Sequence, residues 1–166
     1  MAAAAPAGIP VVLNARSGAE DVPDGGAAVA AAFAARGLHA RIIVLAAGQR
    51  IAATVDDLLD AGADLIVAAG GDGTVNAIAS RLLERDATLG ILPMGTLNHF
   101  ARDLGIPLEI DAAADVIAAG QARRVDVGEV NGKVFLNNSS IGLYPRIVLE
   151  REHAQRHLGA GKWPAL

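Results

Sequence analysis

Four short apolar runs recur in the first part of the chain, and a helix-like segment follows each of them. The runs are Ile9–Asn14, Ala40–Leu45, Asp64–Ala69 and Leu89–Pro93. Their apolar residues are continuous rather than alternating with polar ones, which is typical of strands buried on both faces. The alternation of such strands with helices predicts an α/β fold in which helices cover a parallel sheet.

The segments between these runs show helical periodicity. An alanine-rich helix is expected before Gly37, a second over Ile51–Gly62, a third from Thr74, and a fourth over Thr96–Gly105. The second helix has two distinct faces, an apolar one with Ile51, Val55, Leu58 and Leu59 and an acidic one with Asp56, Asp57 and Asp60. The third repeats apolar residues at Val75, Ile78, Ala79, Leu82 and Leu83. A last helix, capped by Asp111, should end near Gly120.

The pattern changes after Gly120. The residues from Arg124 onwards alternate between polar and apolar, and Asn131-Gly132 is a strong signal for a two-residue hairpin turn. We therefore expect an α/β domain at residues 9–122 and the beginning of a β-rich second domain at residues 123–166, with no room to finish. The hairpin valines Val125, Val127 and Val134 would then be exposed or support a homodimer.

Composition excludes several classes of function. The formal net charge is −4, the basic residues are scattered and only 3% of residues are aromatic, which argues against nucleic-acid binding. No apolar run approaches the roughly 20 residues that span a bilayer. The start of the chain, MAAAAPAG, lacks the features of a secretion signal, and the chain has no cysteine. These features predict a cytoplasmic protein without a transmembrane segment.

A glycine-rich turn follows the third run, in the sequence VAAGGDGTVNAIAS at Val67–Ser80. Glycines between a strand and a helix let the backbone approach phosphate oxygens, and the helix N-terminus directs free N–H groups at them. The carboxylate of Asp72 would repel a bare phosphate, which favours a bound Mg²⁺ or a hydroxyl that is losing its proton. Neither a dinucleotide-binding turn nor a P-loop fits this spacing. A turn whose glycines only permit packing is the alternative.

The glycine turn resembles the GGDGT signature shared by diacylglycerol and sphingolipid kinases, NAD kinases and phosphofructokinases. Three further segments resemble the bacterial diacylglycerol kinase family: NARSG at Asn14–Gly18, LPMGTLNHFARDLGIP at Leu92–Pro107, and RVDVGEVNGKVFLNNSSIGL at Arg124–Leu143. The resemblance covers nearly the whole chain from Ile9 to about Pro164. It implies an N-terminal parallel-sheet domain like that of phosphofructokinases and NAD kinases.

The resemblance also implies a function. The chain is expected to act as an ATP-dependent lipid kinase that transfers a phosphoryl group from Mg-ATP to a hydroxyl of diacylglycerol or a related lipid at a membrane surface. The catalytic acids would be Asp72, acting with the Mg-nucleotide or on the lipid hydroxyl, and Asp126, near the acceptor. The residues expected to surround ATP are Asn14, Ser17, Gly18, Gly70, Gly71, Asp72, Gly73, Thr74, Asn76, Gly95 and Thr96.

Two departures from the family pattern leave alternatives open. His99 stands where many relatives have an aspartate after the asparagine of this segment, and no G-D-G-E-like segment with a late catalytic acid follows Leu143. The second departure favours a nucleotide-binding fragment or a degenerate module without activity. A kinase of the NAD kinase type is a further alternative, although the acidic motif expected in the middle of such a chain is missing.

The last stretch of the chain is basic. His153 and His157 lie four positions apart, yet zinc needs a third protein ligand and the spacing is not that of an H-E-x-x-H motif. A basic, solvated helix is the preferred interpretation. Arg151, Arg156 and Lys162, close to Trp163, would help such a helix to dock on anionic lipid.

Overall fold

The computed structural model describes residues 8–14, 25–45 and 50–137. Four strands, β1 (Ile9–Asn14), β2 (Ala40–Leu45), β3 (Leu65–Gly70) and β4 (Thr88–Pro93), form one sheet. All pairings are parallel and the order is β2-β1-β3-β4. The predicted parallel sheet is confirmed.

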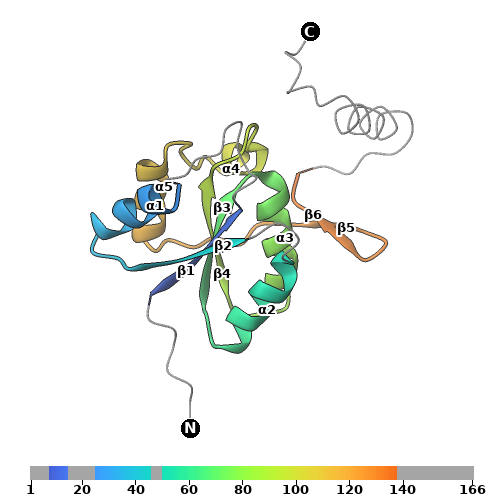
Figure 1. Cartoon of the computed structure of the whole chain (residues 1–166). Helices are drawn as coiled ribbons and strands as arrows, with labels where there is room; N and C mark the ends of the chain where they lie inside the picture. Colours follow the sequence, from blue (N-terminus) through green and yellow to red (C-terminus); the bar gives the residue numbers. More distant parts are fainter. Residues whose placement is uncertain (1–7, 15–24, 46–49, 138–166) are drawn as a thin grey trace, which may run out of the picture.

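Helices cover both faces of this sheet. The first face carries α1 (Gly25–Ala34) and α5 (Ile110–Ala118), and the opposite face carries α2 (Ile51–Asp60) and α3 (Asp72–Leu82), as Figure 1 shows. The short helix α4 (His99–Asp103) follows β4. No helix in the described ranges combines the length and the apolar character needed to cross a bilayer.

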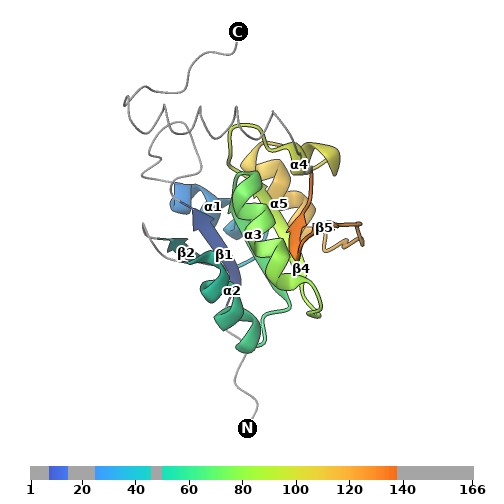
Figure 2. The same ribbon diagram turned by 90° about the vertical axis from the view of Figure 1, so that its right-hand side faces the viewer.

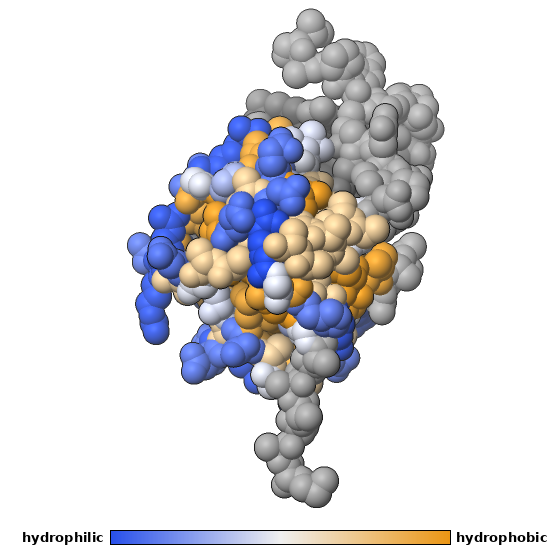
Figure 3. All heavy atoms as spheres, turned by 90° about the vertical axis from the view of Figure 1, so that its left-hand side faces the viewer, coloured by the Kyte–Doolittle hydropathy of each residue, from blue (hydrophilic) through white to orange (hydrophobic). Residues whose placement is uncertain are grey.

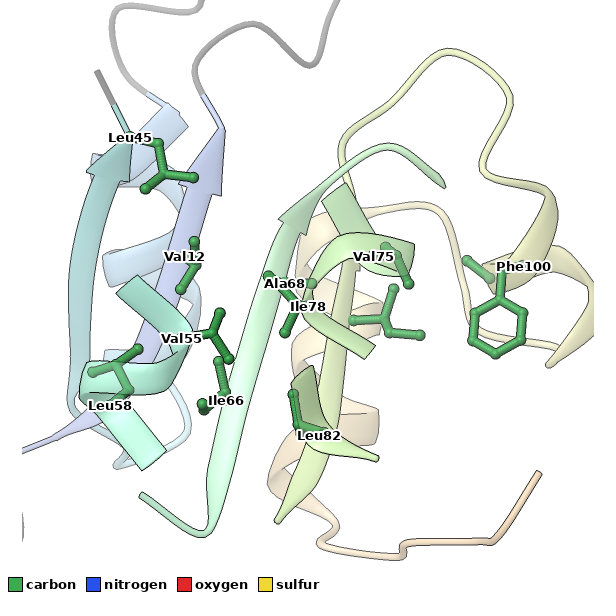
Figure 4. Packing of buried hydrophobic residues seen from close by; sticks show 12 residues of the cluster. Val12, Leu45, Val55, Leu58, Ile66, Ala68, Val75, Ile78, Leu82 and Phe100 are labelled. Atoms are coloured by element: carbon green, nitrogen blue, oxygen red, sulfur yellow. The ribbon is translucent and has the colours of Figure 1, made fainter. Parts of the chain in front are cut away.

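Consecutive residues of the central strands enter two different cores because side chains alternate across a strand. Val12, Ile66 and Ala68 pack with residues of α2, α3 and α4 (Figure 4). Val11 and Val67 pack on the other face with residues of α1 and α5. Both faces of the central strands are buried, which fits their continuous apolar sequences. The same prediction is wrong for β2, because β2 is an edge strand and its Val44 exposes 54% of its surface.

Ion pairs connect the helices on each face of the sheet or the turns that follow them. Arg81 of α3 binds Asp56, and Arg85, just after α3, binds Asp60; both aspartates belong to the acidic face predicted for α2. On the other face, Arg36 binds Asp115 and Asp111 of α5. Figure 3 shows that hydrophilic and hydrophobic residues are intermixed on this side of the molecule.

A β-hairpin packs beside α3 (Figure 2). Its strands, β5 (Gly128–Val130) and β6 (Lys133–Phe135), are antiparallel, and Asn131 and Gly132 between them both have positive φ, 51° and 72°. This is the turn that an Asn-Gly pair predicts. Pairing begins only at Gly128, and the residues from Arg124 to Val127 are exposed and belong to no sheet in the described part of the chain.

Two of the hairpin valines are exposed as expected. Val125 and Val127 expose 42% and 39% of their surface, whereas Val134 is only partly exposed.

Three helix boundaries differ from the predictions. The prediction that the third helix starts at Thr74 is wrong, because α3 begins at Asp72. Its second residue, Gly73, destabilises the helix little, since N–H groups in the first turn have no acceptor within the helix. The fourth helix is restricted to His99–Asp103 because Asn98 has left-handed backbone geometry. Glu109, not Asp111, is the N-cap residue of α5. Asp111 lies in its first turn and binds Arg36.

Candidate functional site

The carboxyl ends of β1, β3 and β4 lie side by side at one edge of the sheet. From β1 the chain proceeds to β2 on one side of β1 and then to β3 on the other, so the connections diverge between β1 and β3. Ligands of open α/β sheets bind at such a point. Asn14 ends β1 here, and its Nδ2 donates a hydrogen bond of 3.0 Å to Oγ1 of Thr74 in α3.

The glycine turn forms the N-terminus of α3. Gly70 ends β3, and Gly71 is the N-cap residue whose carbonyl accepts the N–H groups of Thr74 (2.9 Å) and Val75 (3.1 Å). The N–H groups of Asp72 and Gly73 have no acceptor within the part of the chain that the structure describes. Gly73 is exposed, and a Cβ placed on it would meet no atom of the described residues within 4 Å. Free N–H groups at the positive end of a helix, beside open space, suit an anion.

The loop after β4 lies against this turn. Met94 N donates to Gly70 O at 3.0 Å, and a Cβ on Gly71 would lie only 3.1 Å from the Cα of Gly95. The two glycines thus allow a direct backbone-to-backbone approach. Thr96, which follows Gly95, is exposed.

Asn98 holds the loop after β4 in shape, a role that the sequence analysis missed. Only 7% of this residue is exposed, and its φ is 51°. Its Oδ1 accepts the N–H of Gly95 at 2.9 Å, and its Nδ2 donates to the carbonyl of Gly95 at 2.8 Å. The available signal was an asparagine in a turn, because asparagine tolerates left-handed geometry and bonds to neighbouring backbone.

The side chain of Asp72 contacts the first turn of α4. Its Oδ2 accepts the N–H of His99 at 3.1 Å, and its Oδ1 accepts the N–H of Phe100 at 3.0 Å. His99, whose side chain is exposed, therefore contributes to this site through its backbone.

Other predicted residues lie apart from this arrangement. Asp126 is exposed and makes no hydrogen bond or ion pair in the described residues. Asn76 faces the hairpin, where its Nδ2 donates to Val134 O at 3.2 Å. The described ranges contain no group of three or more His, Cys, Asp or Glu side chains that could hold a metal. Ser17, Gly18 and the basic segment with His153 and His157 lie outside the described residues.

The diacylglycerol kinase catalytic domain family matches residues 9–130, which include the loops after β1, β3 and β4. The chain belongs to this family. It is 54% identical over 77 residues to a diacylglycerol kinase of Bacillus subtilis, and 41% identical over 101 residues to a probable lipid kinase, YegS-like, of an Enterobacter species. Those alignments cover 45% and 58% of this chain.

Solved structures of the family have the same fold. A diacylglycerol kinase crystal structure from Bacillus anthracis matches 79% of this chain with a TM-score of 0.69 and 30% sequence identity. The matched part is 46% of that chain, and the curated relatives are covered to 25% and 34% of their lengths. The family membership confirms the resemblance found in the four sequence motifs.

Proposed function

We propose that this chain carries the nucleotide-binding half of an ATP-dependent lipid kinase. In this proposal the phosphoryl group of Mg-ATP passes to a hydroxyl of diacylglycerol or a related lipid at a membrane surface. The observation that supports it most is the junction of Asn14, the Gly71–Thr74 turn and Gly95 at the divergence point of the sheet. Membership of a kinase family adds the reaction class.

The turn suits the phosphates of the nucleotide. The free N–H groups of Asp72 and Gly73 would donate to phosphate oxygens, and the open space over Gly73 leaves room for them. Asn14 and Thr74 would form the wall on the β1 side, with Ser17 and Gly18 following in the chain. Gly95 and Thr96 would form the wall on the β4 side.

Magnesium fits this site as part of the Mg-ATP substrate. Mg²⁺ is commonly held by one or two carboxylates together with substrate phosphates and water, so it does not need a cage of protein ligands. Among the described residues Asp72 is the carboxylate within the glycine turn, and each of its oxygens accepts one N–H and keeps a further lone pair. When bound, the ion neutralises charge on the transferring phosphoryl group.

The acceptor side of the reaction is assigned to the β-rich part of the chain. We propose that the hairpin begins a second unit from residue 123 onwards and that Asp126 takes part in the acid network near the lipid hydroxyl. The exposed position of Asp126 leaves its carboxylate available for such a contact.

Two measurements test the proposal. Titration calorimetry with Mg-ADP should detect binding to the chain, and ATP turnover should be compared with and without diacylglycerol in lipid vesicles. Binding of Mg-ADP with little turnover supports a nucleotide-binding module whose acceptor half is incomplete. Turnover stimulated by NAD rather than by diacylglycerol would instead support the NAD kinase type, and an absence of Mg-ADP binding would contradict the proposal.

A further inference from the structure

The carboxylate of Asp72 connects two helices that follow different strands. Asp72 is the first residue of α3, whereas its hydrogen-bond donors are the N–H groups of His99 and Phe100, the first two residues of α4. N–H groups in the first turn of a helix have no acceptor within that helix. Asp72 therefore supplies the cap that α4 lacks, because Asn98, its N-cap residue, directs its own side chain to Gly95 instead.

Two more contacts join the glycine turn to the loop after β4: Met94 N donates to Gly70 O, and Gly71 and Gly95 approach backbone to backbone. Within that loop, Asn98 bonds both polar backbone groups of Gly95. The ring of Phe100 is anchored in the core that also contains Val75 of α3 (Figure 4). The glycine turn and the loop after β4 are thus held together at several points. Among the described contacts between them, Asp72 provides the one charged side chain.

We propose that Asp72 is a positioning residue, which holds the loop that carries Gly95 and Thr96 against the glycine turn so that the two walls of the nucleotide site form one unit. This inference rests on the proposed nucleotide-binding function, and it differs from the role that the family resemblance implies for Asp72. Both carboxylate oxygens accept N–H groups of α4. This contact explains why an aspartate stands inside a phosphate-binding turn, and the explanation does not require Asp72 to take the proton of the acceptor hydroxyl. Asp126 is then the remaining candidate for taking the proton of the acceptor hydroxyl, while the second lone pair on each oxygen of Asp72 stays available to the Mg²⁺ of the substrate.

Amide hydrogen exchange of the whole chain, measured by NMR without nucleotide, tests the contact itself. Asp72→Ala removes both acceptor oxygens, whereas Asp72→Asn keeps one. We expect the amides of His99 and Phe100 to exchange at least about tenfold faster in Asp72→Ala and to a smaller extent in Asp72→Asn, since each lost bond to a charged group is a strong one. Asp103→Asn is the matched control, because Asp103 lies exposed on α4 and makes no hydrogen bond through its side chain within the described residues.

Mg-ADP affinity, measured by calorimetry on the same variants, tests the consequence. A positioning role predicts a graded loss, about tenfold for Asp72→Ala and less for Asp72→Asn, with circular dichroism confirming that both variants are folded. Unchanged amide exchange at His99 and Phe100 would overturn the inference, and so would faster exchange with unchanged Mg-ADP affinity. An equal loss of affinity in both variants would also overturn the inference, because Mg-ADP binding would then depend on the charge of Asp72 and not on its contact with α4. If the unaltered chain fails to bind Mg-ADP, the proposed function is wrong, while the exchange data still decide whether Asp72 fastens the loop.

Discussion

The Nδ2 of Asn14 lies 3.0 Å from the Oγ1 of Thr74, although 60 positions separate the two residues along the chain. This hydrogen bond ties the end of β1 to the first turn of α3, across the point where the connections of the sheet diverge. Two sequence motifs that were recognised separately, NARSG and GGDGT, meet through it.

A double-mutant cycle measures this link. Asn14→Ala removes the donor, and Thr74→Val removes the acceptor while keeping a branched side chain at a position that is 4% exposed. We expect a coupling free energy of about 1 kcal/mol in urea unfolding, because that is the usual net contribution of one hydrogen bond. Strictly additive single-mutant effects would show that the bond contributes nothing to stability.

Gly73→Ala separates nucleotide binding from folding. The added methyl group meets no atom within 4 Å in the described part of the chain, and alanine is favoured over glycine in a helix by up to about 1 kcal/mol. The variant should therefore be as stable as the unaltered chain or more so, yet bind Mg-ADP at least about tenfold more weakly because the methyl group occupies space meant for the phosphates.

Gly26→Ala in α1 is the matched control for Gly73→Ala. Its Cβ would meet only side-chain atoms, at 3.5 Å and 3.8 Å, which are ordinary contacts. It should leave Mg-ADP affinity unchanged. Full affinity in Gly73→Ala would mean that the nucleotide does not approach this turn.

The strands and their two buried faces could be predicted because their signal is local. The continuous apolar run Ile9–Asn14 is buried on both faces as predicted, and Ile9–Asn14 and Ala40–Leu45 both have the predicted bounds. The burial of Ala40–Leu45 could not be predicted in this way, because its place at the edge of the sheet depends on the strand order. The Asn131-Gly132 turn could also be predicted, since its backbone geometry depends on those two residues.

The contacts of the polar side chains could not be predicted in this way, because their partners are distant in sequence. Asp72 bonds backbone N–H groups 27 and 28 positions away, and any residue except proline offers such a donor. Asp111 was expected to cap its own helix, but Arg36, which follows α1 and lies 75 positions away, binds it instead. Local sequence indicated that these residues were polar and near helix ends, and only the packing of the helices determined what they contact.

Asn76 should control how firmly the hairpin is attached to α3. Its Nδ2 donates to Val134 O, while its Oδ1 is buried without a partner in the described structure. Asn76→Asp would place a carboxylate oxygen against that carbonyl, so two acceptors would face each other. We expect trypsin to cleave after Lys133 several-fold faster in this variant, because the hairpin opens more often.

Asn137→Asp is the control for this experiment, because it makes the same chemical change at an exposed residue next to the hairpin. It should be cleaved at the rate of the unaltered chain. Equal rates in Asn76→Asp and Asn137→Asp would show that Asn76 does not hold the hairpin.

The pairing of Arg36 with α5 predicts how stability depends on acid. Arg36 donates from Nε to Oδ1 of Asp115 at 2.6 Å, and this hydrogen bond, together with the charge of Arg36, lowers the pKa of Asp115 below its ordinary value of 3.8. Because the pKa of Asp115 is lower in the folded than in the unfolded chain, the pair stabilises the fold fully above pH 3.8 and loses this effect as the pH falls through the lowered pKa.

Asp115→Asn should therefore reduce the unfolding free energy at neutral pH and make its decline in acid less steep, as measured by urea unfolding at a series of pH values. Asp57→Asn is the matched control, since Asp57 lies exposed on α2 and forms no ion pair within the described ranges. This substitution removes one carboxylate but no ion pair, so the unfolding free energy of the variant should change with pH in parallel with that of the unaltered chain. If the two variants showed the same dependence on pH, the contact of Arg36 with Asp115 would not be a source of stability, and the attachment of α1 to α5 would depend on their apolar packing alone.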